Sequence, residues 1–330
     1  MDAGRLWLDR VSSTNTVATW LAEVGWRQRL WVIARHQTAG VGRRGSRWES
    51  PAGGLWCSLL LPGVDIAGST AMSPATDPPD ANRGSRTSVA PITPQWGLDW
   101  LPLLMAAAVA ATAQTLCGLP ASLKWPNDVM VRGRKLAGVL ASAQMVAGRL
   151  QHVVIGVGVN VNVDLATLPV ELRPLVTSVQ AQTGRPWPLD LWLSHLEQAW
   201  WPLYELWRGG ERSQLRHLLM DRWFVPGQPV LVLPKVPEPH RSATLAEPWG
   251  GTPAKRVDLS RGAEVPLSST AAISPLGPLL AQLEGLDERG WAVVWSNDQR
   301  LVLDPNRQTL RLLNLINPKA KSSTPVPVIR

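Results

Sequence analysis

The sequence predicts an α+β fold, with a mixed or antiparallel sheet and flanking helices followed by a small β-barrel. Three observations lead to this class. A glycine-rich loop joins two apolar strands, at 31–34 and 54–61, with no helix between them. Helical patterns at 101–116 and 189–207 stand apart from the strands, and short apolar runs separated by turn residues follow Trp223. The 330 residues leave room for one large domain, or for a large and a small one.

The first elements are a strand at 6–8 and a helix that ends at Gly25. Three polar residues crowd the N-terminus of this helix: Ser13, Thr14 and Asn15. Capping of the helix explains one of them well and the triplet less well. All three are therefore candidate site residues.

The loop at 37–48 contains a Gly-x-Gly-x-x-Gly pattern at Gly40, Gly42 and Gly45. This pattern is a dinucleotide fingerprint only where a helix opens on the glycines. Residues 49–54, Glu-Ser-Pro-Ala-Gly-Gly, cannot propagate a helix, and Ser46 stands where a Walker A loop has its lysine. Neither motif is therefore present.

The same loop combines a flexible backbone with three basic side chains: Arg43, Arg44 and Arg47. Guanidinium groups bind phosphate or carboxylate in a bidentate manner, and free backbone amides can approach an anion. The loop therefore suits an anionic ligand, and a solvated basic turn is the alternative.

A second polar cluster, Lys124-Trp125-Pro126-Asn127-Asp128, contains a turn signal and precedes a hairpin expected at 129–131 and 135–140. A β-branched strand follows at 152–162. Its Gly156 and Gly158 share one face, which Asn160 continues. Glycine within a strand indicates close approach of a ligand or of another backbone.

Two stretches, about 64–96 and 234–276, are rich in Ser, Thr, Pro and Gly. They read as insertions, and the first cannot bury enough apolar surface to offset the entropy of ordering, so we expect it to be disordered. Four short strands of the small barrel are expected at 230–233, 279–286, 291–295 and 300–303. We expect domains at 1–222 and 223–318 and a flexible basic tail at 319–330.

Lys and Arg exceed Asp and Glu by 33 − 25 = 8, which fits nucleic acid, an acidic protein or a phosphorylated small molecule as partner. The chain does not begin with a signal peptide. The most apolar run, 101–117, is shorter than the ~20 residues of a membrane span. We therefore expect a cytoplasmic protein without a membrane partner.

Taken in order, the four polar clusters resemble those of the biotin protein ligases. The most specific parts are Lys124–Asp128 followed by Gly133–Gly138, and Arg44–Trp48 followed by Ser50-Pro51. The resemblance covers residues 5 to about 163 strongly and the C-terminal barrel, SH3-like in that family, more loosely. The helix-turn-helix of family members that double as repressors has no counterpart here, so we expect a monofunctional enzyme.

The resemblance implies an ATP-dependent ligase. The carboxylate of biotin attacks the α-phosphate of ATP, giving biotinyl-5′-AMP and pyrophosphate, and a lysine of the biotin carboxyl carrier protein of acetyl-CoA carboxylase then attacks the acyl carbon. The substrates supply the nucleophiles, so the protein needs positioning and charge stabilisation rather than a catalytic Ser or Cys. Mg²⁺ would accompany ATP, with ligands that the sequence does not identify. We expect a monomer or weak homodimer that does not bind DNA.

The resemblance also assigns roles to single residues. Those expected at biotin are Ser13, Thr14, Asn15, Gln37, Val41, Gly42, Arg43 and Lys124, and Lys124 and Arg43 are the catalytic pair. Those expected at ATP or the adenylate are Arg44, Arg47, Trp48 and Asn160. The glycines expected to permit close approach are Gly40, Gly45, Gly138, Gly156 and Gly158.

The sequence departs from the family pattern Gly-Arg-Gly-Arg-x-Gly-Arg, because Val41 and Ser46 replace its first and last arginines. We expect Arg47 to take over one phosphate contact. Ser142 stands where a glutamate is usual. Two alternatives remain: a lipoate-protein ligase, which shares fold and chemistry, and a basic nucleic-acid-binding protein, which would need basic and aromatic residues interleaved along one face.

Overall fold

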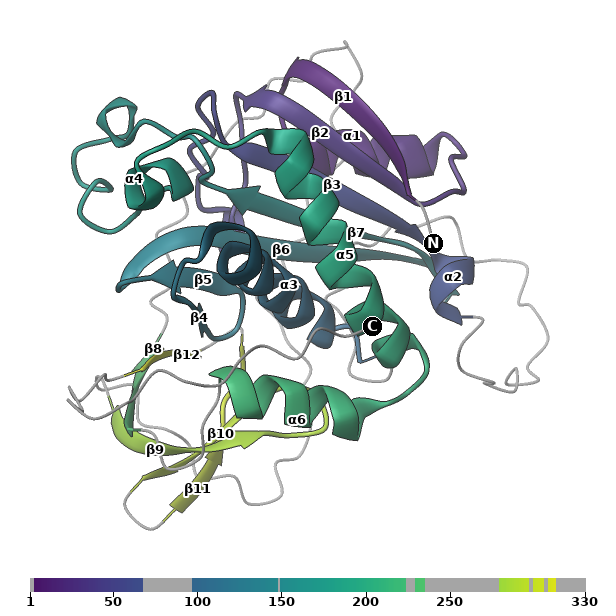
Figure 1. The fold of residues 1–330 in the computed structure, drawn as a ribbon. Coiled ribbons are helices and arrows are strands. Elements are labelled where there is room, and N and C mark those ends of the chain that lie inside the picture. The colour runs from purple at the N-terminus through teal and green to yellow at the C-terminus, as the bar shows by residue number, and fades with distance from the viewer. Residues whose placement is uncertain are drawn as a thin grey trace.

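The computed structural model describes residues 3–67, 97–147, 149–223, 229–234, 279–296, 299–305 and 308–312. It contains a seven-stranded sheet with helices on both faces and, beside it, a five-stranded sheet formed by the C-terminal residues (Figure 1). The α+β class and the mixed sheet are therefore confirmed.

The large sheet has the strand order β1-β2-β3-β7-β6-β5-β4. Its strands are β1 (Gly4–Val11), β2 (Leu30–Gln37), β3 (Leu55–Pro62), β4 (Ala121–Lys124), β5 (Asp128–Val131), β6 (Arg134–Val146) and β7 (Arg149–Val159). β1 and β2 are parallel and joined through helix α1 (Thr14–Glu23), whereas all other neighbours are antiparallel. The glycine loop thus joins two antiparallel strands, as the sequence predicts, and does not belong to a dinucleotide-binding unit.

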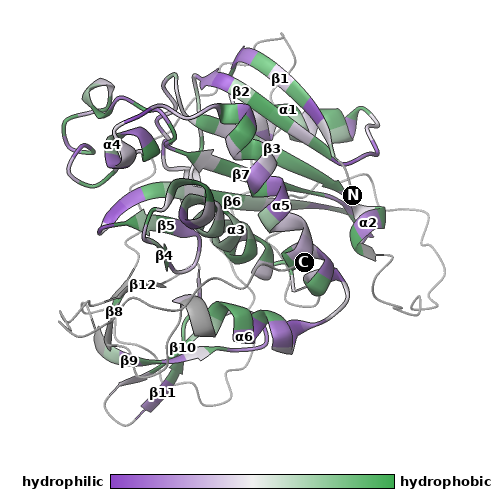
Figure 2. Cartoon of the chain, viewed as in Figure 1, coloured by the Kyte–Doolittle hydropathy of each residue, from purple (hydrophilic) through white to green (hydrophobic). Residues whose placement is uncertain are grey.

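The two faces of this sheet have different cover because side chains alternate along each strand. On one face α1 packs through Ala18 and Ala22 against Val32 and Val154. On the other face lie α3 (Trp100–Cys117) and α5 (Leu189–Arg208). Figure 2 shows hydrophobic residues concentrated on α3 and on the strands beside it. Gly156 and Gly158 are two and four residues after Val154 in the same strand, so they lie on the same face of the sheet as Val154, the α1 face.

Helix α3 is apolar around its circumference, with a mean hydropathy of 1.5 over 18 residues. By length and composition alone it could cross a membrane. Here 67% of that window is buried, and the helix packs against α5 and β6. Its apolarity is accounted for by its position in the protein core.

The smaller sheet has the order β11-β10-β9-β8-β12. Its strands are β8 (Pro229–Pro234), β9 (Leu279–Leu286), β10 (Ala292–Ser296), β11 (Gln299–Val302) and β12 (Gln308–Leu312). All pairs are antiparallel, and the described residues of β11 and β12 do not pair with each other. The described residues of this region therefore form an antiparallel sheet, and its closure into a barrel stays a prediction.

Three indole N–H groups attach the small sheet to the rest of the protein. Trp100 Nε1 donates to the carbonyl of Glu288 at 2.8 Å, and Trp125 Nε1 donates to the carbonyl of Gly290 at 3.2 Å. Trp291 Nε1 donates to Asp99 Oδ2 at 3.0 Å. The turn between β9 and β10 is thereby fixed against α3 and the segment after β4.

Several elements were not expected from the sequence: α2 (Gly63–Ala67), α4 (Val179–Thr183), α6 (Arg212–Trp223), β4, β12 and the 3₁₀ turns at Arg43–Gly45 and Leu165–Thr167. The prediction of disorder from residue 64 was wrong for 64–67, since α2 places Ile66 in the core. The remainder of that insertion (68–96), nearly all of the second (235–276) and the tail (319–330) lie outside the described residues.

Candidate active site

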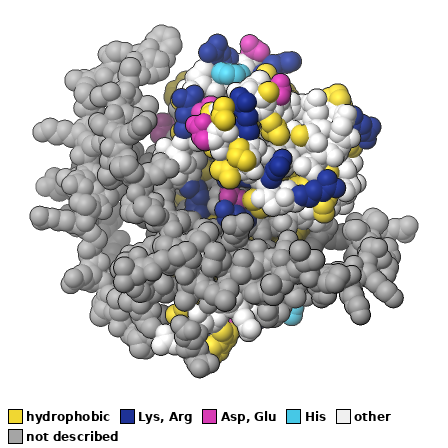
Figure 3. Space-filling model, turned by 90° about the vertical axis from the view of Figure 1, so that its left-hand side faces the viewer, with side chains coloured by type: hydrophobic (Ala, Val, Ile, Leu, Met, Phe, Trp, Pro, Cys, Tyr) yellow, Lys and Arg dark blue, Asp and Glu magenta, His cyan; other side chains and the backbone are white. Residues whose placement is uncertain are grey.

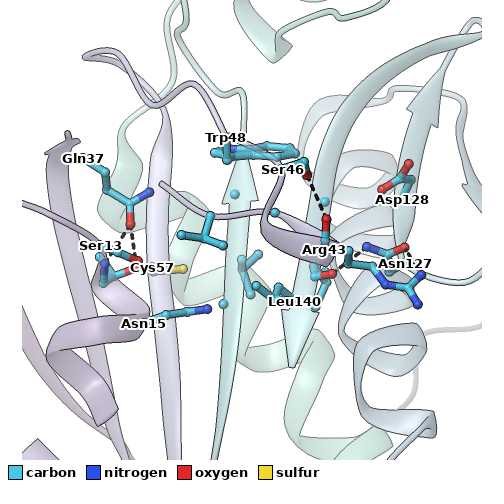
Figure 4. Close-up of a pocket in the computed structure, with 18 of the residues that line it drawn as sticks. Ser13, Asn15, Gln37, Arg43, Ser46, Trp48, Cys57, Asn127, Asp128 and Leu140 are labelled. Atoms are coloured by element: carbon cyan, nitrogen blue, oxygen red, sulfur yellow. Dashed lines mark hydrogen bonds between the residues drawn. The ribbon is translucent and has the colours of Figure 1, made fainter. Parts of the chain in front are cut away.

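A cavity of about 300 Å³ opens on the α1 face of the large sheet (Figure 4). Its floor is formed by β6 and β7, where Gly138, Gly156 and Gly158 leave room for other groups. Twelve of the predicted site residues line it: Ser13, Thr14, Asn15, Gln37, Val41, Gly42, Arg43, Trp48, Lys124, Gly138, Gly156 and Gly158. The four polar clusters, far apart in the sequence, therefore meet around one space.

One end of the cavity is polar but uncharged. Ser13 has the backbone conformation of an N-cap, yet its hydroxyl makes no capping hydrogen bond. The N–H of Thr14 donates instead to Gln37 Oε1 at 2.8 Å. Capping thus does not account for Ser13, whose hydroxyl the helix leaves unused although the residue is only 4% exposed.

Asn15 lies directly on the glycine of β7. A Cβ added to Gly156 would lie 2.3 Å from Asn15 Oδ1, far closer than real contacts allow. The amide oxygen of Asn15 also accepts a hydrogen bond from Ser58 Oγ at 2.6 Å. In this structure the space beside Gly156 is occupied by the side-chain amide of Asn15, and not by a ligand or another backbone, which were the neighbours predicted from the sequence.

The glycine loop folds back on itself as a small hairpin. The N–H of Trp48 donates to the carbonyl of Gly40 at 2.9 Å, and Val41 forms an isolated antiparallel bridge with Arg47. A Cβ on Gly40 would lie 2.5 Å from the carbonyl oxygen of Trp48, which confirms close approach. Gly45 differs, because an added Cβ would meet nothing within 4 Å and its φ of +76° is the feature that favours glycine.

Arg43 projects from this hairpin toward the turn after β4. One of its guanidinium nitrogens donates to Asn127 Oδ1 at 3.2 Å and another to the carbonyl of Pro305 at 2.6 Å. Asn127 is itself held by its own donation to the carbonyl of Val139 at 2.7 Å. The arginine at the cavity is thus positioned by the large sheet and by the C-terminal residues together.

Trp48 covers the cationic end of the cavity. Cβ atoms added to Gly138 and Gly158 would lie 2.9 and 2.7 Å from its indole, so the ring rests on a shelf made by these two glycines. Lys135 Nζ lies 4.9 Å from the ring centroid and 2.7 Å from Asp128 Oδ1. A cation over the indole face and a carboxylate beside that cation stabilise this arrangement.

Lys124, at the end of β4, lines the cavity, and its ammonium makes no hydrogen bond or ion pair with any residue that the structure describes. Lys135 is neutralised by Asp128, whereas the charge of Lys124 is left for a ligand. Its position at the end of a short edge strand, next to the turn at Pro126, directs it to the cavity that Arg43 borders.

Among the predicted site residues whose side chains the structure describes, Arg47 and Asn160 do not line the cavity, and Gly40 and Gly45 do not line it either. Arg47 is 73% exposed at its side chain and pairs with Glu49 at 2.7 Å, so the expected replacement of a phosphate contact is absent here. Asn160 follows the end of β7, is buried, and donates to the carbonyl of Thr177 at 3.0 Å rather than continuing the glycine face. The side chain of Arg44 lies outside the described part of the structure.

Eight further residues line the cavity without having been predicted: Ser46, Cys57, Asn127, Asp128, Lys135, Val139, Leu140 and Val157. Asn127 and Asp128 belong to the Pro-Asn-Asp turn, which could have signalled them. Burial raises the pKa of Cys57 well above its usual range, which disfavours the reactive thiolate form.

The site therefore joins a neutral polar end to a cationic end. Hydroxyl and amide groups of the first suit a ligand with amide-like donors and acceptors, and Lys124 and Arg43 suit phosphate or carboxylate. Among the described residues no group of three or more His, Cys, Asp or Glu could hold a metal ion. Figure 3 shows Lys and Arg side chains scattered among apolar and acidic ones on the described part of one face, not gathered in a stripe.

Comparison with known proteins gives these residues a family context. Residues 7–71 and 85–160 match the sequence model of the Biotin/lipoate A/B protein ligase family. The chain is 32% identical over 181 residues to the bifunctional ligase/repressor BirA of Bacillus spizizenii, a match that covers 54% of this chain and 47% of that protein. It is 33% identical over 181 residues to the biotin–[acetyl-CoA-carboxylase] ligase of Paracoccus denitrificans, covering 54% and 63%.

The solved structure of the biotin protein ligase of Aquifex aeolicus in complex with biotin and ATP has the same fold. Its TM-score is 0.62 at 20% sequence identity, and the alignment covers 94% of this chain and 99% of that one. The matched segment spans about half the length of the Bacillus spizizenii relative, 47%. The resemblance that the motifs indicated is therefore confirmed, and it rests on the part of the chain that forms the cavity.

Replacing Arg43 with glycine is expected to shorten the time that an acyl-adenylate, the intermediate of the ligase reaction that we propose for this chain, stays bound, because the hairpin loses the charge that faces the ligand. Retention is measured as radiolabelled intermediate that remains with the protein after rapid gel filtration. Asn127→Ala should act in the same direction but less strongly, and should add little to Arg43→Gly because it acts through Arg43. Unchanged retention in Arg43→Gly would contradict this role.

Proposed function

We propose that this chain, which resembles the biotin/lipoate protein ligases in sequence and fold, is an ATP-dependent biotin protein ligase. The observation that carries the proposal is the single cavity in which Ser13, Asn15 and Gln37 face the same space as Lys124 and Arg43. The first set suits the ureido ring of biotin, and the second suits the carboxylate and the α-phosphate that must meet.

In the first step a carboxylate oxygen of biotin attacks the α-phosphorus of ATP, the bond to the β-phosphate breaks, and pyrophosphate leaves. Two anions approach each other in this step. Lys124 lowers that repulsion, since its ammonium has no other described partner, and Arg43 closes over the biotinyl-phosphate with the backbone amide of Gly42. Lys124 and Arg43 are thus the catalytic residues, and Val41 contributes only its backbone.

In the second step the amine of a lysine on the biotin carboxyl carrier protein of acetyl-CoA carboxylase attacks the acyl carbon, and AMP leaves. Trp48 covers adenine, with Arg44, Arg47 and Asn160 proposed at the adenylate after the loop moves. Mg²⁺ would accompany ATP and would be held chiefly by its phosphates. Asp128 is the one carboxylate among the residues that line the cavity, and its pairing with Lys135 makes it a poor metal ligand in this arrangement.

The remaining proposals concern the whole protein. Residues 1–222 form the catalytic domain, 223–318 an SH3-like barrel of which the five-stranded sheet is the described part, and 319–330 a tail. We place the enzyme in the cytoplasm, as a monomer or weak homodimer without DNA or membrane partners. The net charge of +8 agrees with an acidic carrier domain as the protein substrate.

A lipoate-protein ligase is disfavoured by the neutral end of the cavity. The dithiolane ring of lipoate has no hydrogen-bonding N–H or C=O groups, so it would leave the Ser13 hydroxyl and the Asn15 amide N–H groups without a partner. The test incubates the full chain with ATP, unmodified carrier protein and either biotin or lipoate, and measures the mass of the carrier. Biotin addition with release of pyrophosphate is expected; lipoate addition, or no addition, would contradict the proposal.

A further inference from the structure

The neutral end of the cavity and the glycine hairpin are connected by a chain of side-chain hydrogen bonds. Ser58 Oγ, on β3, lies 2.6 Å from Asn15 Oδ1 and 2.7 Å from Thr14 Oγ1. The N–H of Thr14 donates to Gln37 Oε1 at 2.8 Å, which leaves the hydroxyl proton of Thr14 for Ser58 Oγ and the hydroxyl proton of Ser58 for Asn15 Oδ1. Each link is a close contact between groups on different elements, α1, β2 and β3, so the chain crosses the base of the site.

From Gln37 the chain continues into the hairpin. Gln37 Nε2 donates to Ser50 Oγ at 2.9 Å, and Ser50 Oγ donates to the carbonyl of Trp48 at 3.2 Å. Trp48 closes the hairpin through its N–H to Gly40. The side-chain amide of Gln37 thus accepts a hydrogen bond from Thr14 and also positions Trp48, because the hydroxyl of Ser50 connects the two.

The side chains of this hydrogen-bonded chain cannot easily move independently of one another. Thr14 and Ser50 are each 3% exposed and Ser58 is fully buried, so water does not replace a broken link. The amide of Gln37 has a fixed orientation, since its oxygen accepts from Thr14 and its nitrogen donates to Ser50. A ligand that moves Gln37 or Asn15 must therefore move the base of the hairpin, and a shift of the hairpin reaches those residues.

We propose that Ser50 and Ser58 are positioning residues that couple the ring-binding end of the site to the hairpin carrying Arg43 and Trp48. Neither serine lines the cavity, so neither touches a ligand there. Their effect passes through Gln37 and Asn15. This inference rests on the proposed function, because it identifies the two ends with biotin and ATP.

The coupling is measurable as the factor by which an ATP analogue changes the affinity for biotin, and the reverse factor must be equal. Calorimetric titration of the full chain with biotin, with and without a non-hydrolysable ATP analogue, gives this factor. Ser50→Ala removes the hydroxyl that accepts from Gln37 and donates to Trp48, and so interrupts the chain at one point. We expect the factor to fall roughly three- to tenfold, since the net contribution of a hydrogen bond is of that order. The affinity for biotin alone should change less.

Ser178→Ala is the matched control, because Ser178 is also a fully buried serine and its hydroxyl accepts from the N–H of Ala181 outside the chain of contacts. It should lower the melting temperature without changing the coupling factor. Ser58→Ala tests the opposite end of the chain of hydrogen bonds, and it decides the question if Ser50→Ala does not fold. In the double variant the loss of coupling should be no larger than in Ser50→Ala alone, because both substitutions interrupt the same chain.

The possible results separate the two proposals. Loss of coupling in Ser50→Ala and Ser58→Ala but not in Ser178→Ala supports the inference. Undiminished coupling in both variants, equal loss in the control, or absence of coupling in the parent protein overturns it while leaving biotin ligation intact. A parent protein that binds neither biotin nor the ATP analogue contradicts the proposed function instead.

Discussion

Replacing Lys124 with alanine is expected to lower the rate of adenylate formation by roughly 10²–10³, the range for losing one preorganised charged or hydrogen-bonding group in a transition state. Lys124 has no partner among the described residues, so its charge is available to the two anions that must approach. The rate is measured as biotin-dependent release of pyrophosphate under single-turnover conditions. Biotin binding should suffer less, because the neutral end of the site is unchanged.

The matched control is Arg149→Ala, which removes an exposed cation at the opposite end of β7 from the glycines. It should leave the rate unchanged. A near-normal rate in Lys124→Ala would remove Lys124 from the site. An equal loss in both variants would mean that total charge, rather than position, determines the rate.

The second large effect is expected at two glycines that are neighbours on one face of β7. An alanine at 156 would force its Cβ to within 2.3 Å of the Asn15 amide, whereas an alanine at 158 would come within 2.7 Å of the Trp48 indole. Gly156→Ala should therefore weaken biotin binding roughly 10- to 100-fold, by displacing one or two polar groups. Gly158→Ala should act mainly on ATP.

Each variant is the control for the other, since both place the same methyl group on the same strand. Equilibrium titrations with biotin and with ATP in each variant provide the measurement. If Gly156→Ala weakens mainly biotin binding and Gly158→Ala weakens mainly ATP binding, biotin is assigned to the neutral end of the cavity and ATP to the cationic end. If both variants lose affinity for both ligands equally, strand distortion rather than local contact explains the effect.

Local patterns were enough to predict the arrangement of the large sheet around the glycine loop. Residues 49–54 cannot form a helix, which excluded the dinucleotide motif, and the shared parity of Gly156 and Gly158 placed both on one face of β7. Helices α3 and α5 also followed from composition and periodicity. Elements with weak local signals were missed: α6 lacks a clear apolar stripe, and β4 has only four residues before Pro126.

The candidate site shows the same limit. Lys124, Arg43 and the Ser13–Asn15 cluster could be predicted because the motifs mark them in the sequence. Lys135 and Ser58 could not, because their roles depend on tertiary neighbours: Lys135 on Asp128 and Trp48, and Ser58 on the first turn of α1. Asn160 does not continue the glycine face because the strand ends one residue before it, which turns its side chain toward Thr177.

The central claim is that one cavity binds biotin and ATP and joins them. The most direct measurement incubates the full chain with ATP labelled at the α-phosphate and follows transfer of the label to a biotin adduct by chromatography. We expect biotinyl-5′-AMP to accumulate on the protein with parent enzyme and to decrease strongly with Lys124→Ala. Absence of a labelled biotin adduct with the folded parent protein, or the same yield with Lys124→Ala, would contradict the account.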